Sequence, residues 1–369
     1  MTDQPVVERV DTAVYAVPTD APEADGTLAW NSTTIVLATV HCGEINGIGY
    51  TYAPAATAGI IDELLADEIT GTAAFDTARA NEAMQRAVRN AGLPGIAAQA
   101  VSAVDIALWD AKARLLRLPL VQLLGQARDM VPIYGSGGFT TYDDQQQERQ
   151  LRGWVEDENI PRVKIKIGES WGQEEARDRQ RLAQARTSIG DGAELYADAN
   201  GAYSVKQAVR MANALSAEGA TWFEEPVSSD HLDLLAAIRD RITADVAAGE
   251  YGYTLPYFQH MLAARAVDCL QADVTRCGGI TVWLRIAALA QAHGLEISGH
   301  CAPHAHAHAA ASVPNLRHLE WFHDHVRIER LLFDGVLDPQ GGALAPGADG
   351  APGLGLNLDA ERARPFRRK

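Results

Sequence analysis

The chain has 369 residues, which is too long for one ordinary domain and suits an α/β barrel of about 250 residues with a smaller companion. With 47% hydrophobic and 22% charged residues it has the composition of a soluble globular protein, and no apolar run approaches the roughly 20 residues that cross a bilayer. The net charge of −16 argues against nucleic acid as a partner but leaves room for a small anionic ligand in a cleft with local cations.

The N-terminus and the cysteines predict a cytoplasmic location. The opening segment MTDQPVVERVDTAVYAVP carries acids early and lacks the basic and apolar parts of a secretion signal. The cysteines stand at wide, irregular spacings without a CxxC pair, at Cys42, Cys269, Cys277 and Cys301. This pattern is typical of a reduced compartment rather than of a disulfide framework.

Residues 1–128 are predicted to form a small α+β domain. Three β-rich segments come first, at residues 7–18, 32–42 and 47–54. Helical segments follow, one from the N-cap Asp76 to a stop at Gly92, and one over residues 97–116 with apolar residues at helical spacing. Strands followed by helices within one block indicate an α+β arrangement.

Residues 129–335 change to short apolar strands that alternate with amphipathic helices. The predicted strands are 131–137, 162–168, 194–200, 221–226, 245–250, 269–276, 295–301 and 316–321. Their spacing matches the β/α unit of a barrel. The predicted fold is therefore an α/β protein, a modified TIM barrel (β/α)7β with an N-terminal α+β capping domain. Residues 336–369 are rich in Gly and Pro and are expected to pack back on the cap.

Most of the later predicted strands end in an ionisable residue, where the active sites of α/β barrels are assembled. In the strand of residues 162–168, alternation places Lys164 and Lys166 on one face. Solvated lysines on a half-exposed strand are the ordinary interpretation. Barrel strands have no solvated face, so both lysines are expected in the interior, where each lowers the pKa of the other and one amine becomes a neutral base.

Three carboxylates follow on successive strand ends, at Asp198, Glu224 and Glu250. Each alone has a plain alternative, such as capping the following helix. Together they would repel one another unless a cation lay between them, and hard oxygen ligands predict Mg²⁺. Asn200 is placed on the same strand face as Asp198, in a supporting role, whereas Glu225 points the other way and is interpreted as structural.

The next strand ends carry Asp273 and His300, and a carboxylate beside an imidazole provides a second acid/base group. Glu320 ends the last strand and could donate a hydrogen bond to a substrate oxygen if it is held protonated, although a structural ion pair has the same pattern. The histidine run after His300 offers only His304 and His308 on one helix face, which does not favour a metal site there. The glycines match no nucleotide-binding motif.

The series Lys-Ile-Lys, Asp-Ala-Asn, Glu-Glu-Pro, Gly-Glu, Asp273, Gly-His and Leu-Glu-Trp resembles the enolase superfamily and, within it, the mandelate racemase subgroup. The segment SAVDIALWDAKARLLRLPLVQLLG resembles the capping-domain helix and the lead-in to the barrel of that family. The resemblance implies that Lys166, with Lys164 beside it, is the base on one face of the substrate. It further implies Mg²⁺ ligands at Asp198, Glu224 and Glu250, a His300 and Asp273 dyad on the opposite face, and a Glu320 hydrogen bond to the substrate carboxylate.

The implied chemistry is abstraction of the proton α to a carboxylate through an enediolate, which a metal ion and a cationic lysine stabilise. Dehydration of a sugar acid to a 2-keto-3-deoxy acid is the preferred hypothesis, with racemisation, epimerisation and cycloisomerisation as alternatives. Substrate contacts are predicted from the capping loops of residues 18–30 and 50–55 and from the barrel strands. The predicted contact residues are Trp30, Tyr52, Ser136 and Asn200. The aromatic residues have domain-interface packing as an equal alternative.

Other classes are less consistent with the sequence. A zinc hydrolase barrel would carry a His-x-His pair on its first strand, which the segment IYGSGG lacks. A barrel kept only as a scaffold would have lost a ligand or a base, and all are present. The expected partners are a small-molecule carboxylate and further copies of the chain, because related proteins form dimers to octamers.

Overall fold

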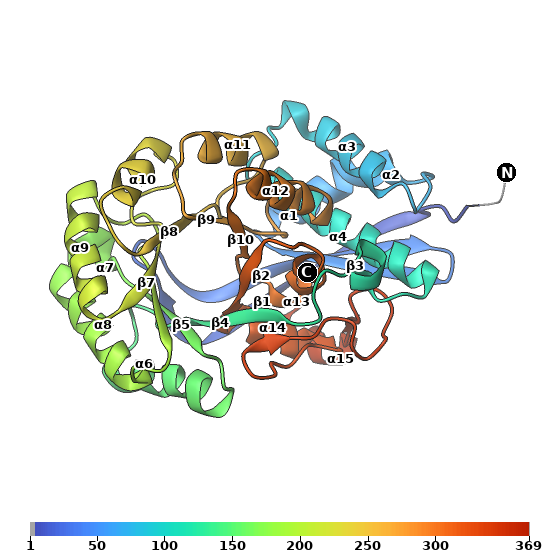
Figure 1. The fold of residues 1–369 in the computed structure, drawn as a ribbon. Helices are drawn as coiled ribbons and strands as arrows, with labels where there is room; N and C mark the ends of the chain where they lie inside the picture. The colour runs from blue at the N-terminus through green and yellow to red at the C-terminus, as the bar shows by residue number, and fades with distance from the viewer. Residues whose placement is uncertain (1–3, 369) are drawn as a thin grey trace.

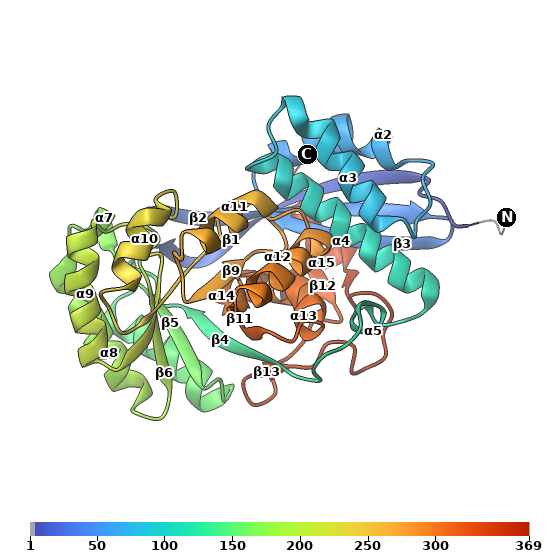
Figure 2. The ribbon, with the colours of Figure 1, turned by 45° about the horizontal axis from the view of Figure 1, so that its top comes forward.

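The computed structural model describes residues 4–368 and has two parts, an antiparallel sheet with helices and a closed barrel (Figure 1, Figure 2). The sheet has the order β1-β2-β3. Its strands are β1 (Arg9–Ala24), β2 (Ala29–Cys42) and β3 (Ile45–Tyr52). The cap helices are α1 (Ala56–Ile60), the π-helical η1 (Ile61–Leu65), α2 (Ala66–Ile69), α3 (Thr77–Ala87) and α4 (Ile96–Leu116). Asp76 does occupy the N-cap position of α3, but its side chain makes no capping hydrogen bond.

The hairpin of β1 and β2 is longer than the sequence indicated. Residues 18–30 were expected to form a loop, yet strand pairing resumes after an irregularity between Pro18 and Glu23 and continues to the Ala24–Ala29 pair. The extended hairpin contacts the barrel, where Thr140 N donates to Ala24 O at 2.9 Å. These tertiary contacts stabilise the strand conformation, which local sequence could not indicate. Both views show the hairpin reaching across to the barrel (Figure 1, Figure 2).

Helix α4 lies very close to β3 because two glycines provide the space. A Cβ atom added at Gly49 would lie 2.2 Å from Ala103 O, and one added at Gly47 would lie 2.2 Å from Ala107 O. Both obstacles are backbone atoms, so a side chain at either position would push the helix away from the sheet.

The substitution Gly49→Ala is therefore expected to lower the free energy of unfolding by about 3 kcal/mol, because the overpacked helix must shift. Urea denaturation followed by circular dichroism measures the change. Gly59→Ala in α1 is the matched control, since nothing lies within 4 Å of its added Cβ, and alanine there should stabilise by roughly 0.5–1 kcal/mol. Equal urea midpoints for Gly49→Ala and Gly59→Ala would contradict the close packing of α4 on β3.

The barrel consists of eight parallel strands closed by pairing between β11 and β4, and all eight predicted strands are confirmed. They are β4 (Val131–Gly137), β5 (Arg162–Lys166), β6 (Glu194–Asp198), β7 (Ala220–Glu224), β8 (Asp245–Ala248), β9 (Cys269–Ala272), β10 (Glu296–Gly299) and β11 (Leu316–Phe322). The main outer helices are α6 (Asp144–Arg152), α8 (Glu175–Ile189), α9 (Val205–Ala217), α10 (Leu232–Arg239), α11 (Leu255–Ala263), α12 (Ile280–Ala292), α13 (Pro303–Ala311) and α14 (His323–Leu332).

The C-terminal segment contacts both parts of the molecule. Strand β13 (Ala343–Leu344) pairs with β4 of the barrel, whereas β14 (Asn357–Leu358) pairs with β12 (Phe333–Asp334). In the same segment, Leu354 N donates to Asp110 of α4 at 2.7 Å, and Arg368 N donates to Val14 O of β1 at 2.8 Å. Within residues 4–368, no helix is both long and apolar enough to cross a membrane.

Candidate active site

The lysines of β5 point into the barrel. Their neighbours Val163 and Ile165 face outward and are completely buried, which alternation predicts for a strand covered by helices. Lys164 is completely buried, and Lys166 is 5% exposed. Below them, Tyr134, Tyr196 and Trp222 fill the lower interior, with the Tyr134 and Tyr196 ring centres 5.6 Å apart. The lysines therefore lie in a buried layer near the mouth.

Three carboxylates end the neighbouring strands, and the parallel register aligns them. In the strand register, Asp198 lies opposite Lys166 of β5 on one side and opposite Glu224 of β7 on the other. Glu250 follows the end of β8 by two residues. All three are buried, and each offers an oxygen within 4.8 Å of the others. Glu250 Oε2 is buried without a hydrogen-bond donor among the described residues. A buried set of hard oxygen donors with an unsatisfied member fits a divalent cation of the Mg²⁺ type.

The surrounding acids outweigh the predicted lowering of the pKa of each lysine by the other. Lys164 forms ion pairs with Glu224 and, at 2.8 Å, with Glu320, and Lys166 pairs with Asp198 at 2.5 Å. Burial lowers the pKa of Lys164, but these carboxylates raise it by more, so it lies well above its ordinary value. The pKa of Lys166 is raised in the same way, by Asp198. The prediction of a neutral amine is wrong for the protein alone, because it counted the lysine pair and not its neighbours.

The predicted dyad lies across the mouth from the lysines. His300 Nδ1 and Asp273 Oδ2 are 2.8 Å apart, and Asp273 Oδ1 accepts from both Thr275 N and Thr275 Oγ1 at 2.7 Å. Burial raises the pKa of Asp273, but the hydrogen bond from His300 and nearby positive charge lower it by more. Asp273 is therefore an ionised, fixed acceptor that orients the ring, and His300 Nε2 lies 3.3 Å from Glu250 Oε2.

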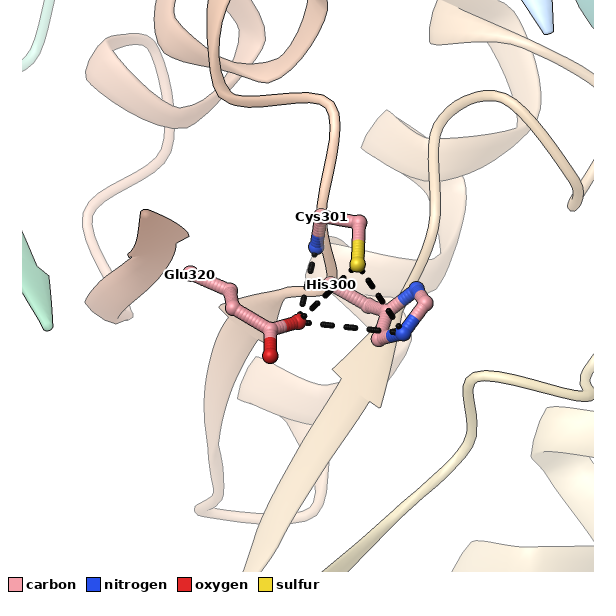
Figure 3. A group of neighbouring side chains, drawn as sticks. All are labelled: His300, Cys301 and Glu320. Atoms are coloured by element: carbon pink, nitrogen blue, oxygen red, sulfur yellow. Dashed lines mark hydrogen bonds and ion pairs between the residues drawn. The ribbon is translucent and has the colours of Figure 1, made fainter. Parts of the chain in front are cut away.

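Figure 3 shows His300 together with Cys301 and Glu320, whose side chains converge. Cys301 Sγ lies 3.3 Å from His300 Nε2 and 3.3 Å from Glu320 Oε2. Burial and the charge of Glu320 raise the pKa of this thiol well above its ordinary value, so the sulfur keeps its proton in the protein alone. Cys301 was not predicted as a neighbour of these groups, although its position directly after His300 was the available signal.

The structure corrects the predictions for Glu320 and Ser136. Glu320 lies within β11 and is completely buried, where it accepts hydrogen bonds from Ser136 Oγ at 2.6 Å and from Cys301 N at 2.9 Å. Burial raises its pKa, but Lys164 and His300 lower it well below its ordinary value, so Glu320 is not held protonated. Ser136 is also completely buried and does not line the cavity, because its hydroxyl is engaged by Glu320.

A cavity of about 390 Å³ lies between the barrel mouth and the cap hairpin. The predicted contact residues Trp30, Tyr52 and Asn200 line it, together with Lys166, Glu250 and His300. Tyr52 also takes part in the domain interface, because its hydroxyl lies 3.1 Å from Glu329 Oε1 and its ring stacks on His325. Tyr52 therefore packs at the domain interface and also lines the cavity, and its contact with substrate stays a prediction.

Asn200 lies beyond the end of β6 rather than on its face. It adopts a left-handed backbone conformation with φ of 45°, and its N–H donates to Asp198 Oδ1 at 2.8 Å. Its side-chain Oδ1 is buried and has no hydrogen-bond partner in the described part of the chain. The turn therefore fixes Asp198 and leaves an amide oxygen free at the cavity.

The histidines of α13 make hydrogen bonds and an ion pair within the fold. His304 pairs with Glu329, His306 Nε2 accepts from Val274 N at 2.8 Å, and His308 Nδ1 accepts from Val121 N at 3.1 Å. Each ring therefore contacts a different element, and the three do not share a ligand position.

A closed α/β barrel with three clustered carboxylates, two lysines and a histidine around its mouth is typical of metal-assisted acid–base barrel enzymes. Family models agree with this class: the Mandelate racemase / muconate lactonizing enzyme N-terminal domain matches residues 9–125, and the Enolase C-terminal domain-like model matches residues 146–363. The chain belongs to the mandelate racemase / muconate lactonizing enzyme family of the enolase superfamily, which confirms the resemblance seen in the sequence.

Characterised relatives are similar over most of their length. A 3,6-anhydro-alpha-L-galactonate cycloisomerase from Streptomyces coelicolor is 31% identical, covering 97% of this chain and 98% of the relative. An L-talarate/galactarate dehydratase from Salmonella typhimurium is 29% identical, covering 85% and 82%. The crystal structure of a mandelate racemase/muconate lactonizing enzyme-like protein from Rubrobacter xylanophilus is 48% identical, with a TM-score of 0.95 over 99% of this chain and 100% of that one. Other structural neighbours were crystallised with magnesium.

Proposed function

We propose that this protein uses Mg²⁺ to abstract the proton α to the carboxylate of a sugar acid and then expels the β-hydroxyl, which yields a 2-keto-3-deoxy acid. The observation that carries the proposal is the placement of two acid/base groups at the two ends of one carboxylate cluster. Lys166 contacts Asp198 at 2.5 Å, and His300 lies 3.3 Å from Glu250. Both lysine and histidine line the same cavity, so a ligand there meets one on each side.

Asp198, Glu224 and Glu250 would hold Mg²⁺, which would supply positive charge for the substrate carboxylate and compete with the lysines for these acids. Lys166 then takes the α-proton at Nζ, and the electron pair delocalises into the carboxylate as an enediolate. The cation Lys164, paired with Glu320 deeper in the barrel, adds positive charge below this position.

His300 delivers a proton from Nε2 to the β-hydroxyl, which leaves as water, and Asp273 stabilises the charged ring before that transfer. The resulting enol tautomerises to the 2-keto acid. If the substrate has no leaving group at the β-carbon, the same two groups give racemisation or epimerisation, and intramolecular attack gives cycloisomerisation. The relatives include both dehydratases and cycloisomerases, which supports this range of outcomes.

The proposal is tested by incubating the protein and Mg²⁺ with a library of aldonic and aldaric acids and assaying for 2-keto-3-deoxy acids. A product identifies dehydration and the substrate together. Without product, incorporation of deuterium at the α-carbon in D₂O separates racemisation from inactivity. No exchange with any acid would contradict the proposed function. Assembly into dimers to octamers and the cytoplasmic location stay predictions.

Adding Mg²⁺ to protein stripped with EDTA is expected to raise the melting temperature, because the ion relieves repulsion among buried carboxylates. At 100 times the dissociation constant the gain is about 2.7 kcal/mol. Differential scanning fluorimetry across a Mg²⁺ series measures it. Glu250→Gln should abolish most of the shift, whereas Glu63→Gln on the exposed surface of the cap should keep it. An unchanged shift in Glu250→Gln would place the ion elsewhere.

A further inference from the structure

A second cavity adjoins the catalytic one and shares Asn200 and Tyr251 with it. Its volume is about 550 Å³, and it lies among the hairpin tip and the loops that follow the barrel strands. Aromatic side chains form much of its wall, including Trp171, which is 65% exposed, and Tyr251, which is 43% exposed. A substrate longer than the catalytic cavity could therefore extend past Asn200 and Tyr251 into the second cavity.

Positive charge in the two cavities is confined to the catalytic cluster. Among the described lining residues, the only lysine and arginine side chains are Lys166 and Arg276, both in the first cavity. The Arg276 guanidinium lies 3.6 Å from Glu250 and 3.4 Å from Asp273, so it serves the catalytic acids. His325 accepts from Ala302 N at 3.2 Å, and burial lowers the pKa of this ring well below its ordinary value, so it stays neutral.

Acidic and neutral hydrogen-bonding groups occupy the remaining walls. Asp25 at the hairpin tip lines the first cavity, and its Oδ1 accepts from Thr27 N at 2.6 Å and from Leu28 N at 2.8 Å. Glu225 lines the second cavity with 1% exposure, and its Oε1 has no hydrogen-bond partner among residues 4–368. Buried acceptors without partners favour a ligand that brings hydroxyl donors.

We infer that the substrate carries a single carboxylate and that its far end is uncharged and hydroxylated. This inference rests on the proposed function, in which the catalytic cluster takes the one carboxylate. A second carboxylate would have to lie beside Asp25 or Asp230, and the described lining residues offer no free lysine or arginine to pair with it, which costs desolvation and repulsion. Hydroxyl groups and the apolar faces of a sugar chain match the unpaired oxygens and aromatic walls. Among acid sugars, the site therefore selects aldonic over aldaric acids.

Matched pairs of six-carbon aldonic and aldaric acids with the same configuration test the inference. Calorimetric titration into magnesium-loaded Lys166→Ala protein measures binding without turnover, and α-proton exchange in the wild-type enzyme measures chemistry. The best-bound aldonic acid is expected to bind at least about 100-fold more tightly than its diacid. Equal or tighter binding of the diacids, or no binding of any aldonic acid, would overturn the inference. If aldonic acids bind more tightly than diacids but no acid exchanges its α-proton, the proposed chemistry is refuted and the inference about the substrate still stands.

The substitution Asp25→Asn tests the source of the selectivity, because asparagine keeps the Oδ1 acceptor for Thr27 and Leu28 and removes the charge. The substitution is expected to reduce the ratio between the affinities for the aldonic acid and its diacid by about 10-fold. Asp240→Asn, at a position 78% exposed and outside both cavities, should leave the preference unchanged. A preference that persists in Asp25→Asn would show that this carboxylate does not select against diacids.

Discussion

Replacing Lys166 by alanine is expected to abolish α-proton exchange, with a loss of at least about 1000-fold in kcat, because the variant has no general base on that side of the cavity. The fold should persist. Asp198, the partner of Lys166, keeps its hydrogen bond from Asn200 N at 2.8 Å and lies 3.7 Å from the Lys164 ammonium, so its charge does not become unpaired. NMR in D₂O follows exchange of the α-proton, and thermal unfolding followed by circular dichroism follows the fold.

Two variants separate a catalytic role from loss of charge. Lys166→Arg keeps the positive charge, but its guanidinium stays protonated, so it should lose exchange nearly as completely. Lys206→Ala, on the exposed surface of α9, should leave exchange intact. If Lys166→Ala unfolded, or if Lys166→Arg retained full activity, the lysine would be a structural partner of Asp198 and not the base.

His300→Asn is expected to stop dehydration while α-proton exchange continues. Asparagine retains a hydrogen-bond donor for Asp273 but cannot deliver a proton to a leaving hydroxyl, so product formation should fall by about 1000-fold. Exchange at the α-carbon depends on Lys166 and should stay within about 10-fold of the wild-type rate. Parallel assays of the 2-keto-3-deoxy acid and of deuterium incorporation measure the two steps separately.

His293→Asn provides the matched control, because His293 is exposed at the end of α12. Both activities should be unchanged in that variant. Equal losses of exchange and dehydration in His300→Asn would instead indicate that His300 takes the first proton. The Asp273→Asn variant should resemble His300→Asn, since an amide opposite Nδ1 no longer stabilises the charged ring.

Much of the site could be predicted from sequence because, in a barrel, the order of residues along the strands determines where their side chains lie. Strand period fixes which side chains face inward, and parallel pairing brings successive strand ends to one mouth. Asp198, Glu224 and Glu250 therefore form a cluster whose members were identifiable separately, and Asp273 contacts His300 as expected. Both the carboxylate cluster and the contact between Asp273 and His300 follow from regular strand geometry, and local sequence specifies the strands.

The sequence by itself determined the barrel, its cap and the inward-facing ionisable residues, because alternation and motif order are local properties. Only the tertiary structure decided their charge states and their distance from the cavity. Glu320 was expected at the substrate but lies deeper, held by Lys164 and Ser136, and the acids around the lysines set their pKa. The hairpin that brings Asp25 to the cavity is likewise stabilised by barrel contacts. Electrostatic interactions depend on all neighbours in three dimensions, which no single strand encodes.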